Sequence, residues 1–271
     1  MKRNILLLFT FFACITVQGQ TPVRLVDLRS EHLDRPIGLD NPVPRLSWRM
    51  EDGRQGAVQT SWRIVVDEDS LNVVNGCGRM WDSGKNDSRN QLVAYAGKKL
   101  QPFTRYYWKV ICSDMEYKET ASPVSYFETG MMGMQHWQGA WIGDGKDIHY
   151  GPAPYFRKEF KTGKKVKSAR AYIAAAGLYE LYINGEKIGD HCLAPLYTRF
   201  DRRNLYVAYD VTSQLQNGDN AIGVLLGNGW YNHQSKAVWD FDRAPWRNRP
   251  TFCLDLRITY TDGSVERSEE Q

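Results

Sequence analysis

The sequence predicts an all-β protein built from two β-sandwich domains. The chain is rich in aromatic residues, with 9 Trp, 15 Tyr and 10 Phe. Short runs rich in Tyr, Trp, Val, Ile and Thr alternate with Gly, Asn and Asp, while amphipathic helical stretches are scarce, which is typical of strands joined by turns. The 271 residues exceed the ~100 to 150 residues of an ordinary single domain, so we expect two hydrophobic cores.

The first element is an N-terminal signal peptide, residues 1–19. Two basic residues precede an apolar run over residues 5–13, and small residues lead to Gly19, after which we expect cleavage. The run is far shorter than the ~20 residues of a membrane-spanning helix, so the protein is expected to be exported, periplasmic or extracellular, with no membrane span. Lipid attachment at Cys14 is the weaker alternative, because two phenylalanines form a poor lead-in to a lipidated cysteine.

The mature chain is nearly neutral and holds four scattered cysteines. Loss of Lys2 and Arg3 with the leader lowers the balance of basic and acidic residues from 35 − 31 to 33 − 31, which gives no reason to expect nucleic acid as a partner. The cysteines form no CxxC pair. An exported protein can form disulfides, but a chain of this length has ample core without them, so we expect mostly free, buried thiols.

The first domain is expected over residues 20–131. Its candidate strands are 44–50, 59–68, 90–97, 104–114 and 124–130. The clearest lies in "LQPFTRYYWKV", where alternate residues from Leu100 to Val110 form one apolar face. About seven short strands in roughly a hundred residues are typical of a sandwich of the immunoglobulin or fibronectin type III kind. The segment "GMMGMQHW" (130–137) has no strand pattern and is expected to be a linker or a docking segment.

The second domain is expected over residues 137–271. Its candidate strands are 153–160, 167–177, 179–185, 205–212, 220–230 and 251–264. We expect an antiparallel sandwich of the jelly-roll kind, like that of carbohydrate-binding modules.

One hairpin of this domain can be predicted in detail, "GLYELYINGEKIGD" (177–190). Tyr179, Leu181 and Ile183 should face the core, while Glu180 and Tyr182 face away. Asn184-Gly185 supplies the two positive-φ residues of a tight type I′ turn, and Asp262-Gly263 is expected to do the same in "TYTDGSV".

No self-contained catalytic motif is found. The sequence has no GxSxG, HExxH or Walker-type loop, and its five histidines lack metal-ligand spacing. Asp240 and Asp242 are the one suggestive acidic pair, since a spacing of two puts both on one face of an extended segment. Glycosidase carboxylates must flank a bond at ~5 to 9 Å, however, and we favour a salt-bridged surface loop here.

A polar-ligand site is predicted at "GNGWYNHQ" (227–234). Trp230 could stack on a sugar ring while nearby polar groups bind its hydroxyls, or it could close the end of the sandwich core. Asn184 and Asp190 are by default turn and loop residues. Calcium is the one cofactor left open, because hard cations prefer carboxylate and amide oxygens, although no dense acidic loop supports it.

Long, ordered motifs cover the mature sequence. The first half holds "LRSEHLDRPIGLDNPVPRLSWRM", "WDSGKNDS", "YAGKKLQPFTRYYWKV" and "FETG", and the second half holds "WIGD", "APYFRKEF", "GLYELYINGEKIGDHCLAPLYTRFDRRNLYVAYDVTSQL", "GDNAIGVLLGNGWY" and "YTDGS". In these motifs the chain resembles the N-terminal part of bacterial α-L-rhamnosidases of glycoside hydrolase family 78. The resemblance implies a fibronectin-like leading domain followed by the rhamnosidase N-terminal β-sandwich.

The resemblance also implies site residues. The second domain is similar to carbohydrate-binding modules, some of which bind terminal L-rhamnose with calcium. The motif match points to five positions, Asn184, Asp190, Asn228, Trp230 and Tyr231. The family usually has Gly-Trp where this chain has Leu196-Tyr197, so the contact of that tryptophan is not carried over.

Family members continue into an (α/α)6 barrel that carries the catalytic carboxylates, whereas this chain stops at "TDGSVERSEEQ". We therefore expect a non-catalytic N-terminal portion of an α-L-rhamnosidase that acts on rhamnose-containing glycans, with the missing barrel as its partner. A free-standing carbohydrate-binding protein, a structural spacer and a hydrolase in its own right are the alternatives. A fragment could also lack its last strands and leave an unpaired sheet edge.

Overall fold

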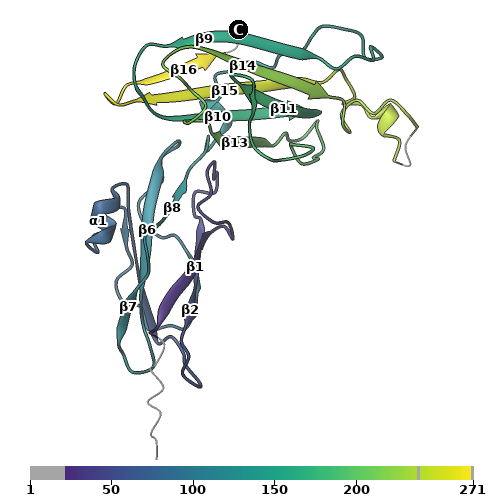
Figure 1. Cartoon of the computed structure of the whole chain (residues 1–271). Helices are drawn as coiled ribbons and strands as arrows, with labels where there is room; N and C mark the ends of the chain where they lie inside the picture. Colours follow the sequence, from purple (N-terminus) through teal and green to yellow (C-terminus); the bar gives the residue numbers. More distant parts are fainter. Residues whose placement is uncertain (1–21, 237–238, 270–271) are drawn as a thin grey trace, which may run out of the picture.

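The computed structural model describes residues 22–236 and 239–269. The predicted signal peptide and Cys14 lie outside these residues. Figure 1 shows two β-domains, with the second lying across one end of the first. Along the described part of the chain, no helix is both long and apolar enough to cross a membrane.

The first domain is an immunoglobulin-like sandwich of two antiparallel sheets. One sheet has the order β1-β2-β5, and in the other β4-β3-β6-β7 are joined by β8, which also pairs with β6. The strands are β1 (Arg24–Ser30), β2 (Arg45–Glu51), β3 (Ser61–Asp67), β4 (Trp81–Asp82), β5 (Leu92–Ala94), β6 (Arg105–Ser113), β7 (Glu119–Ala121) and β8 (Ser125–Glu128), with the short helix α1 (Ser70–Val74) after β3.

The core of this domain confirms the alternation predicted for β6. Tyr106, Trp108 and Val110 are fully buried and pack with Ile64 of the neighbouring strand β3 and with Leu46 of the facing sheet. Because successive strand residues point to opposite faces, these alternate residues of β6 form one apolar face, and this face packs against the facing sheet.

The second domain is a sandwich of two four-stranded antiparallel sheets. Their orders are β13-β10-β15-β16 and β12-β11-β14-β9. The strands are β9 (Tyr155–Thr162), β10 (Val166–Ala176), β11 (Leu178–Ile183), β12 (Glu186–Lys187), β13 (Tyr206–Asp210), β14 (Gly218–Gly227), β15 (Thr251–Tyr260) and β16 (Val265–Glu269), and short 3-10 turns occur at η1 (Met134–His136) and η2 (Phe241–Arg243). One apolar cluster fills the space between the two sheets.

The hairpin β11–β12 has the predicted form. Tyr179, Leu181 and Ile183 are buried, and Asn184 (φ 53°) and Gly185 (φ 86°) both adopt the positive φ of a type I′ turn.

The hairpin β15–β16 differs from the prediction. Of its Asp262-Gly263 pair only Gly263 (φ 84°) has a positive φ, and the amide of Tyr260 donates to the carbonyl of Ser264. Three residues therefore form the loop, as in a type I turn followed by a bulged glycine. The physical reason is the Asp262 carboxylate, which accepts from the amide of Ser264 at 2.9 Å and from Lys164 Nζ at 2.8 Å.

The cysteines of the described chain form no disulfide. Cys112 and Cys253 are buried, as predicted for thiols that pack like small apolar residues. Cys77 and Cys192 are exposed, so the prediction of buried thiols is wrong for these two, which lie in loops rather than in core strands.

The two domains are docked through polar and aromatic contacts. The loops at one end of the first domain meet the outer face of sheet β13-β10-β15-β16. The Tyr206 hydroxyl donates to Asp40 Oδ1 at 2.8 Å and accepts from the Met131 amide at 3.0 Å. Phe103 lies against Tyr172 at a ring distance of 5.5 Å. The segment after β8 thus docks the domains rather than linking them loosely.

Close approach explains a glycine in this interface. A Cβ on Gly130 would lie 1.9 Å from the Tyr206 hydroxyl, so any side chain there would push the domains apart. Gly130 is therefore a requirement of the docking.

Candidate functional site

Aromatic rings gather in the loops at one end of the second domain, near η2 in Figure 1. We call this group the aromatic end. Its members come from the loop before β13, from the loop after β14 and from the region of η2: Tyr197, Phe200, Trp230, Tyr231, His233, Trp239, Phe241 and Trp246.

Phe241 lies at the centre of the aromatic end. Its ring centroid is 5.6 Å from that of Tyr197, 5.5 Å from Trp230 and 5.9 Å from Trp239. The rings meet in tilted and edge-to-face arrangements, which the quadrupoles of aromatic rings favour. These contacts hold the loop before β13 against the loop between β14 and β15, and the sequence pattern around Phe241 gave no sign of this role.

The outer rings of the aromatic end face solvent. Trp239 is 77% exposed, Tyr197 47% and Trp230 46%. Trp230 therefore does not close the sandwich core, and that alternative is wrong. Exposed apolar groups that are gathered in one place mark ligand or protein contact surfaces.

Trp230 is supported from its flank. The His233 ring stacks nearly parallel to it, at a centroid distance of 5.6 Å and an angle of 22°. The His233 Nε2 in turn lies 3.2 Å from the Ser235 hydroxyl. These contacts restrict the Trp230 ring, which lowers the entropy lost when a ligand stacks on it.

A buried amide holds the loop below Trp230. Asn232 is fully buried, and its Nδ2 donates to the Ile148 carbonyl at 2.9 Å and to Asn228 Oδ1 at 3.1 Å. Its Oδ1 accepts from Arg247 Nε at 3.2 Å. A buried amide with satisfied hydrogen bonds fixes one conformation of the loop.

Two predicted site residues lie beneath the surface of this loop. Asn228 accepts from the main chain of Asn232 at 3.1 Å as well as from its side chain, and so stabilises the turn. The Tyr231 ring packs on Phe200 at 5.1 Å, and burial raises the pKa of its hydroxyl. Of the three residues that the structure brings together here, Trp230 offers the contact surface, while Asn228 and Tyr231 shape it.

Asn184 is placed at the opposite end of β14. Its Nδ2 donates to the Gln214 carbonyl at 2.8 Å and to Asn220 Oδ1 at 2.9 Å, and its Oδ1 accepts from the Ala221 amide at 2.8 Å. Asn184 contacts Ala221, six residues before the end of β14, so roughly 20 Å of strand separates it from the loop that carries Trp230. The hydrogen bonds of Asn184 are those of a structural turn residue.

Asp190 is also apart from the aromatic end. It lies in the exposed loop after β12, where the His191 Nδ1 is 3.9 Å from Asp190 Oδ1. The adjacent Gly189 packs against the Tyr209 ring, which keeps this loop at the edge of the sandwich.

These positions do not fit a calcium site. Among the described residues, no group of three or more His, Cys, Asp and Glu side chains could hold a metal ion. The side-chain oxygen of Asn184 already accepts a backbone hydrogen bond, and Asp190 is fully exposed. Calcium prefers six to eight oxygen ligands, which these isolated groups do not supply.

The acidic pair is arranged differently from the expectation. Asp240 (φ 52°) precedes η2 and Asp242 lies inside it, so the two are on a tight turn and not on one face of an extended strand. The Asp242 carbonyl accepts from Arg247 at 3.2 Å, and its carboxylate lies 4.0 Å from Arg243. This is a salt-bridged loop and not two carboxylates facing each other across a cleft.

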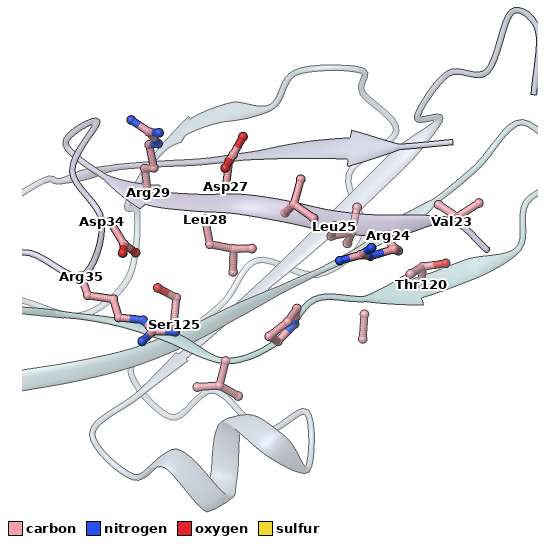
Figure 2. Close-up of a pocket in the computed structure, with 14 residues that line it drawn as sticks. Val23, Arg24, Leu25, Asp27, Leu28, Arg29, Asp34, Arg35, Thr120 and Ser125 are labelled. Atoms are coloured by element: carbon pink, nitrogen blue, oxygen red, sulfur yellow. The ribbon is translucent and has the colours of Figure 1, made fainter. Parts of the chain in front are cut away.

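A groove of about 520 Å³ lies on the first domain, between β1 and the β7–β8 edge (Figure 2). Figure 2 shows Leu28 pointing into it, while Asp27 and Arg29 point away. Its rim carries Arg24 and Arg35 and it has no aromatic ring among its lining residues, so it lacks the stacking surface that the predicted sugar site requires.

Family descriptions match both domains. Residues 25–133 match the "Rha78A-like, N-terminal immunoglobulin domain", and residues 164–269 match the "Alpha-L-rhamnosidase N-terminal domain". The two matches follow the two sandwiches of the structure.

Known proteins are similar to the chain over both domains together. An α-L-rhamnosidase of Formosa agariphila is 32% identical over 96% of this chain, and the chain spans about 30% of that relative's length. The structure of an α-L-rhamnosidase from Dictyoglumus thermophilum has 36% identity and a TM-score of 0.82, covering 90% of this chain and 28% of its own. That of an Aspergillus terreus α-L-rhamnosidase has 26% identity and a TM-score of 0.78, covering 92% and 29%.

Proposed function

We propose a function on the premise that this chain carries the immunoglobulin-like and N-terminal domains of the α-L-rhamnosidases. The chain would be the non-catalytic N-terminal portion of an enzyme that removes terminal α-L-rhamnose from glycans. Its second domain would hold the glycan at the aromatic end. The exposed and stacked ring of Trp230 is the observation that carries this proposal.

The physical basis is ring stacking. The apolar face of a sugar ring packs on an exposed aromatic plane, while nearby polar groups bind its hydroxyls. Trp230 supplies a restricted plane, and Trp239 and Tyr197 supply further exposed rings on the same group of loops. Exposed rings from two loops allow contact with more than one sugar.

Export belongs to the same proposal. The basic residues and apolar run of residues 1–19 support a cleaved signal peptide and a periplasmic or extracellular place of action. Mass spectrometry of the protein recovered from the periplasm of a bacterial host would give the mass of a chain beginning at Gln20. We also assign the first domain to the fibronectin type III kind within the immunoglobulin-like class.

Two assays test the proposal. Calorimetry with millimolar L-rhamnose, with and without calcium, is expected to give binding heat in both conditions. Incubation with an aryl α-L-rhamnoside is expected to release no phenol. Absence of binding heat would refute the sugar-holding role, and release of phenol that is lost in Asp240→Asn would make the chain itself a hydrolase.

A structural spacer is the second candidate function. It is favoured by the buried contacts between the domains, which fix their orientation and so could set the position of a further domain. This role predicts that the chain binds no rhamnose, whereas the sugar-holding role predicts binding that Trp230→Ala removes at unchanged stability.

A further inference from the structure

A groove runs over the outer face of sheet β12-β11-β14-β9, on the side away from the core. Its floor is the central strand β14, whose outward positions Ala221 and Gly223 are small. Two adjoining hollows of about 440 and 520 Å³ share Arg157 and Ala221 in their lining. We call this feature the sheet-face groove. Small residues on a central strand leave a trough between the side chains of its two neighbours.

Tyrosines stand on both sides of the floor. In the cross-strand register Gly223 lies between Tyr182 of β11 and Arg157 of β9, and in the next outward row Leu225 lies between Glu180 of β11 and Tyr155 of β9. The walls stand on β11 and β9, which are two strand spacings of ~4.8 Å apart, so their backbones are separated by roughly 10 Å. Tyr155 is 78% exposed, so its ring is open to a ligand.

The Tyr182 ring is held in place by a carboxylate. Its hydroxyl donates to Glu180 Oε2 at 2.6 Å, and Lys187 donates to the other oxygen of the same group. The hydrogen bond from Lys187 lowers the pKa of Glu180, so the carboxylate stays ionised and can accept further hydrogen bonds. This wall of the groove is thus the oriented ring of Tyr182 beside a hydrogen-bond acceptor, the Glu180 carboxylate.

The charges of the sheet-face groove cancel. Arg157 pairs with Glu159 at 2.7 Å and Lys161 with Asp219 at 3.1 Å, and Lys187 pairs with Glu180. A charged ligand would have to break one of these pairs, so the groove complements a neutral ligand. A peptide strand is disfavoured as well, because β14 is hydrogen-bonded to β11 and β9 on both edges.

We propose that the sheet-face groove binds a neutral oligosaccharide, whose rings stack on Tyr155 and Tyr182 and whose hydroxyls bond to Glu180 and Arg157. This site is separate from the aromatic end, where the proposed function places the terminal sugar. The sheet-face groove would hold the sugar units that precede this terminal sugar in the glycan chain. The choice of a rhamnose-terminated probe rests on the proposed function.

Gly223→Val is the decisive variant. A Cβ at Gly223 would meet its nearest atoms at 3.6 and 3.8 Å, which is ordinary contact, and a β-branched residue favours a strand. The variant should therefore fold at least as stably as the parent while its side chain fills the floor. Tyr155→Ala removes one wall. Gly151→Val, at a position outside the groove where a Cβ meets no atom within 4 Å, is the matched control.

The experiment is an NMR titration of the ¹⁵N-labelled chain with a neutral, rhamnose-terminated oligosaccharide. We expect amide shifts along residues 180–182 and 221–225. Gly223→Val should weaken this binding at least roughly tenfold and Tyr155→Ala roughly three- to tenfold, whereas Gly151→Val should leave it unchanged. Thermal unfolding of each variant verifies that it is folded.

The outcomes separate the two proposals. Shifts in the groove that persist in Trp230→Ala and vanish in Gly223→Val support the sheet-face groove. Shifts confined to residues 228–233 overturn it and leave the proposed function standing. No shifts anywhere overturn both.

Discussion

Arg170 of the second domain and Glu128 of the first form a bidentate ion pair, with Nε–Oε1 at 2.6 Å and Nη2–Oε2 at 3.0 Å, and both side chains are less than a tenth exposed. Arg105 also contacts Glu128 at 3.0 Å, and Asp210 contacts Arg170 at 2.8 Å. The pair crosses the domain interface and is buried only because the domains are docked.

Removal of one partner should therefore be costly. Glu128→Ala leaves the Arg170 guanidinium buried with less compensation, and we expect a loss of about 3–5 kcal/mol in the free energy of unfolding. Denaturant unfolding should then show two transitions, one for each domain. The double variant Glu128→Leu with Arg170→Met is the control, because an apolar pair should recover much of the loss; equal loss in both variants would contradict this account.

Gly130 gives a steric test of the same interface. Gly130→Ala places a Cβ against the Tyr206 hydroxyl and should separate the domains, which small-angle scattering would detect as a larger radius of gyration. Tyr206→Phe in the same chain removes the clashing oxygen and should restore part of the docking. Gly151→Ala, which meets no atom within 4 Å, is the matched control and should change nothing.

Asn184 should matter for stability and not for binding at the aromatic end. Asn184→Gly keeps the positive φ but removes three side-chain hydrogen bonds, so we expect a loss of about 1–3 kcal/mol in denaturant unfolding. Rhamnose affinity should stay within the error of the measurement. A variant of full stability that has lost sugar binding would make Asn184 a ligand contact after all.

The first domain should lose stability in acid. Hydrogen bonds from Arg45 lower the pKa of Glu31 to about 2, from an ordinary value of 4.5. A lowered folded-state pKa means that the stabilisation is complete above the unfolded value and is lost as the pH falls towards the folded one. Melting temperatures measured between about pH 5 and about pH 2 should fall less steeply for Glu31→Gln than for the parent. Equal slopes would show that this pair contributes nothing.

Local pattern was enough to predict most of the strands and one hairpin. Alternation in β6 and β11 and the Asn184-Gly185 turn depend only on neighbours in sequence, and the structure has them as predicted. Strand β1 was not predicted, because a bulge at Asp27 (φ 51°) breaks its alternation. Between β7 and β8, Pro123 has no amide hydrogen to donate to β6. The segment that pairs with this edge of β6 is therefore divided into two short strands.

The sites depend on contacts that no local pattern contains. Arg170 sits in an alternating strand, where a charge normally means solvent, and only the first domain buries it. Phe241 is part of a charged loop in sequence but contacts the Tyr197 ring of the loop before β13 and the Trp230 ring of a distant part of its own loop. The sheet-face groove requires the register of β9, β11 and β14, which places Tyr182 and Arg157 on either side of Gly223.

Calorimetric titration of the chain and of its Trp230→Ala variant with a rhamnose-terminated oligosaccharide tests the central claim most directly. Loss of a stacked aromatic ring should weaken binding roughly three- to tenfold or more, and because Trp230 lies outside the core, the melting temperature should hardly change. Equal affinity in the two proteins, or no binding by the parent chain, would contradict a sugar-holding role for the aromatic end.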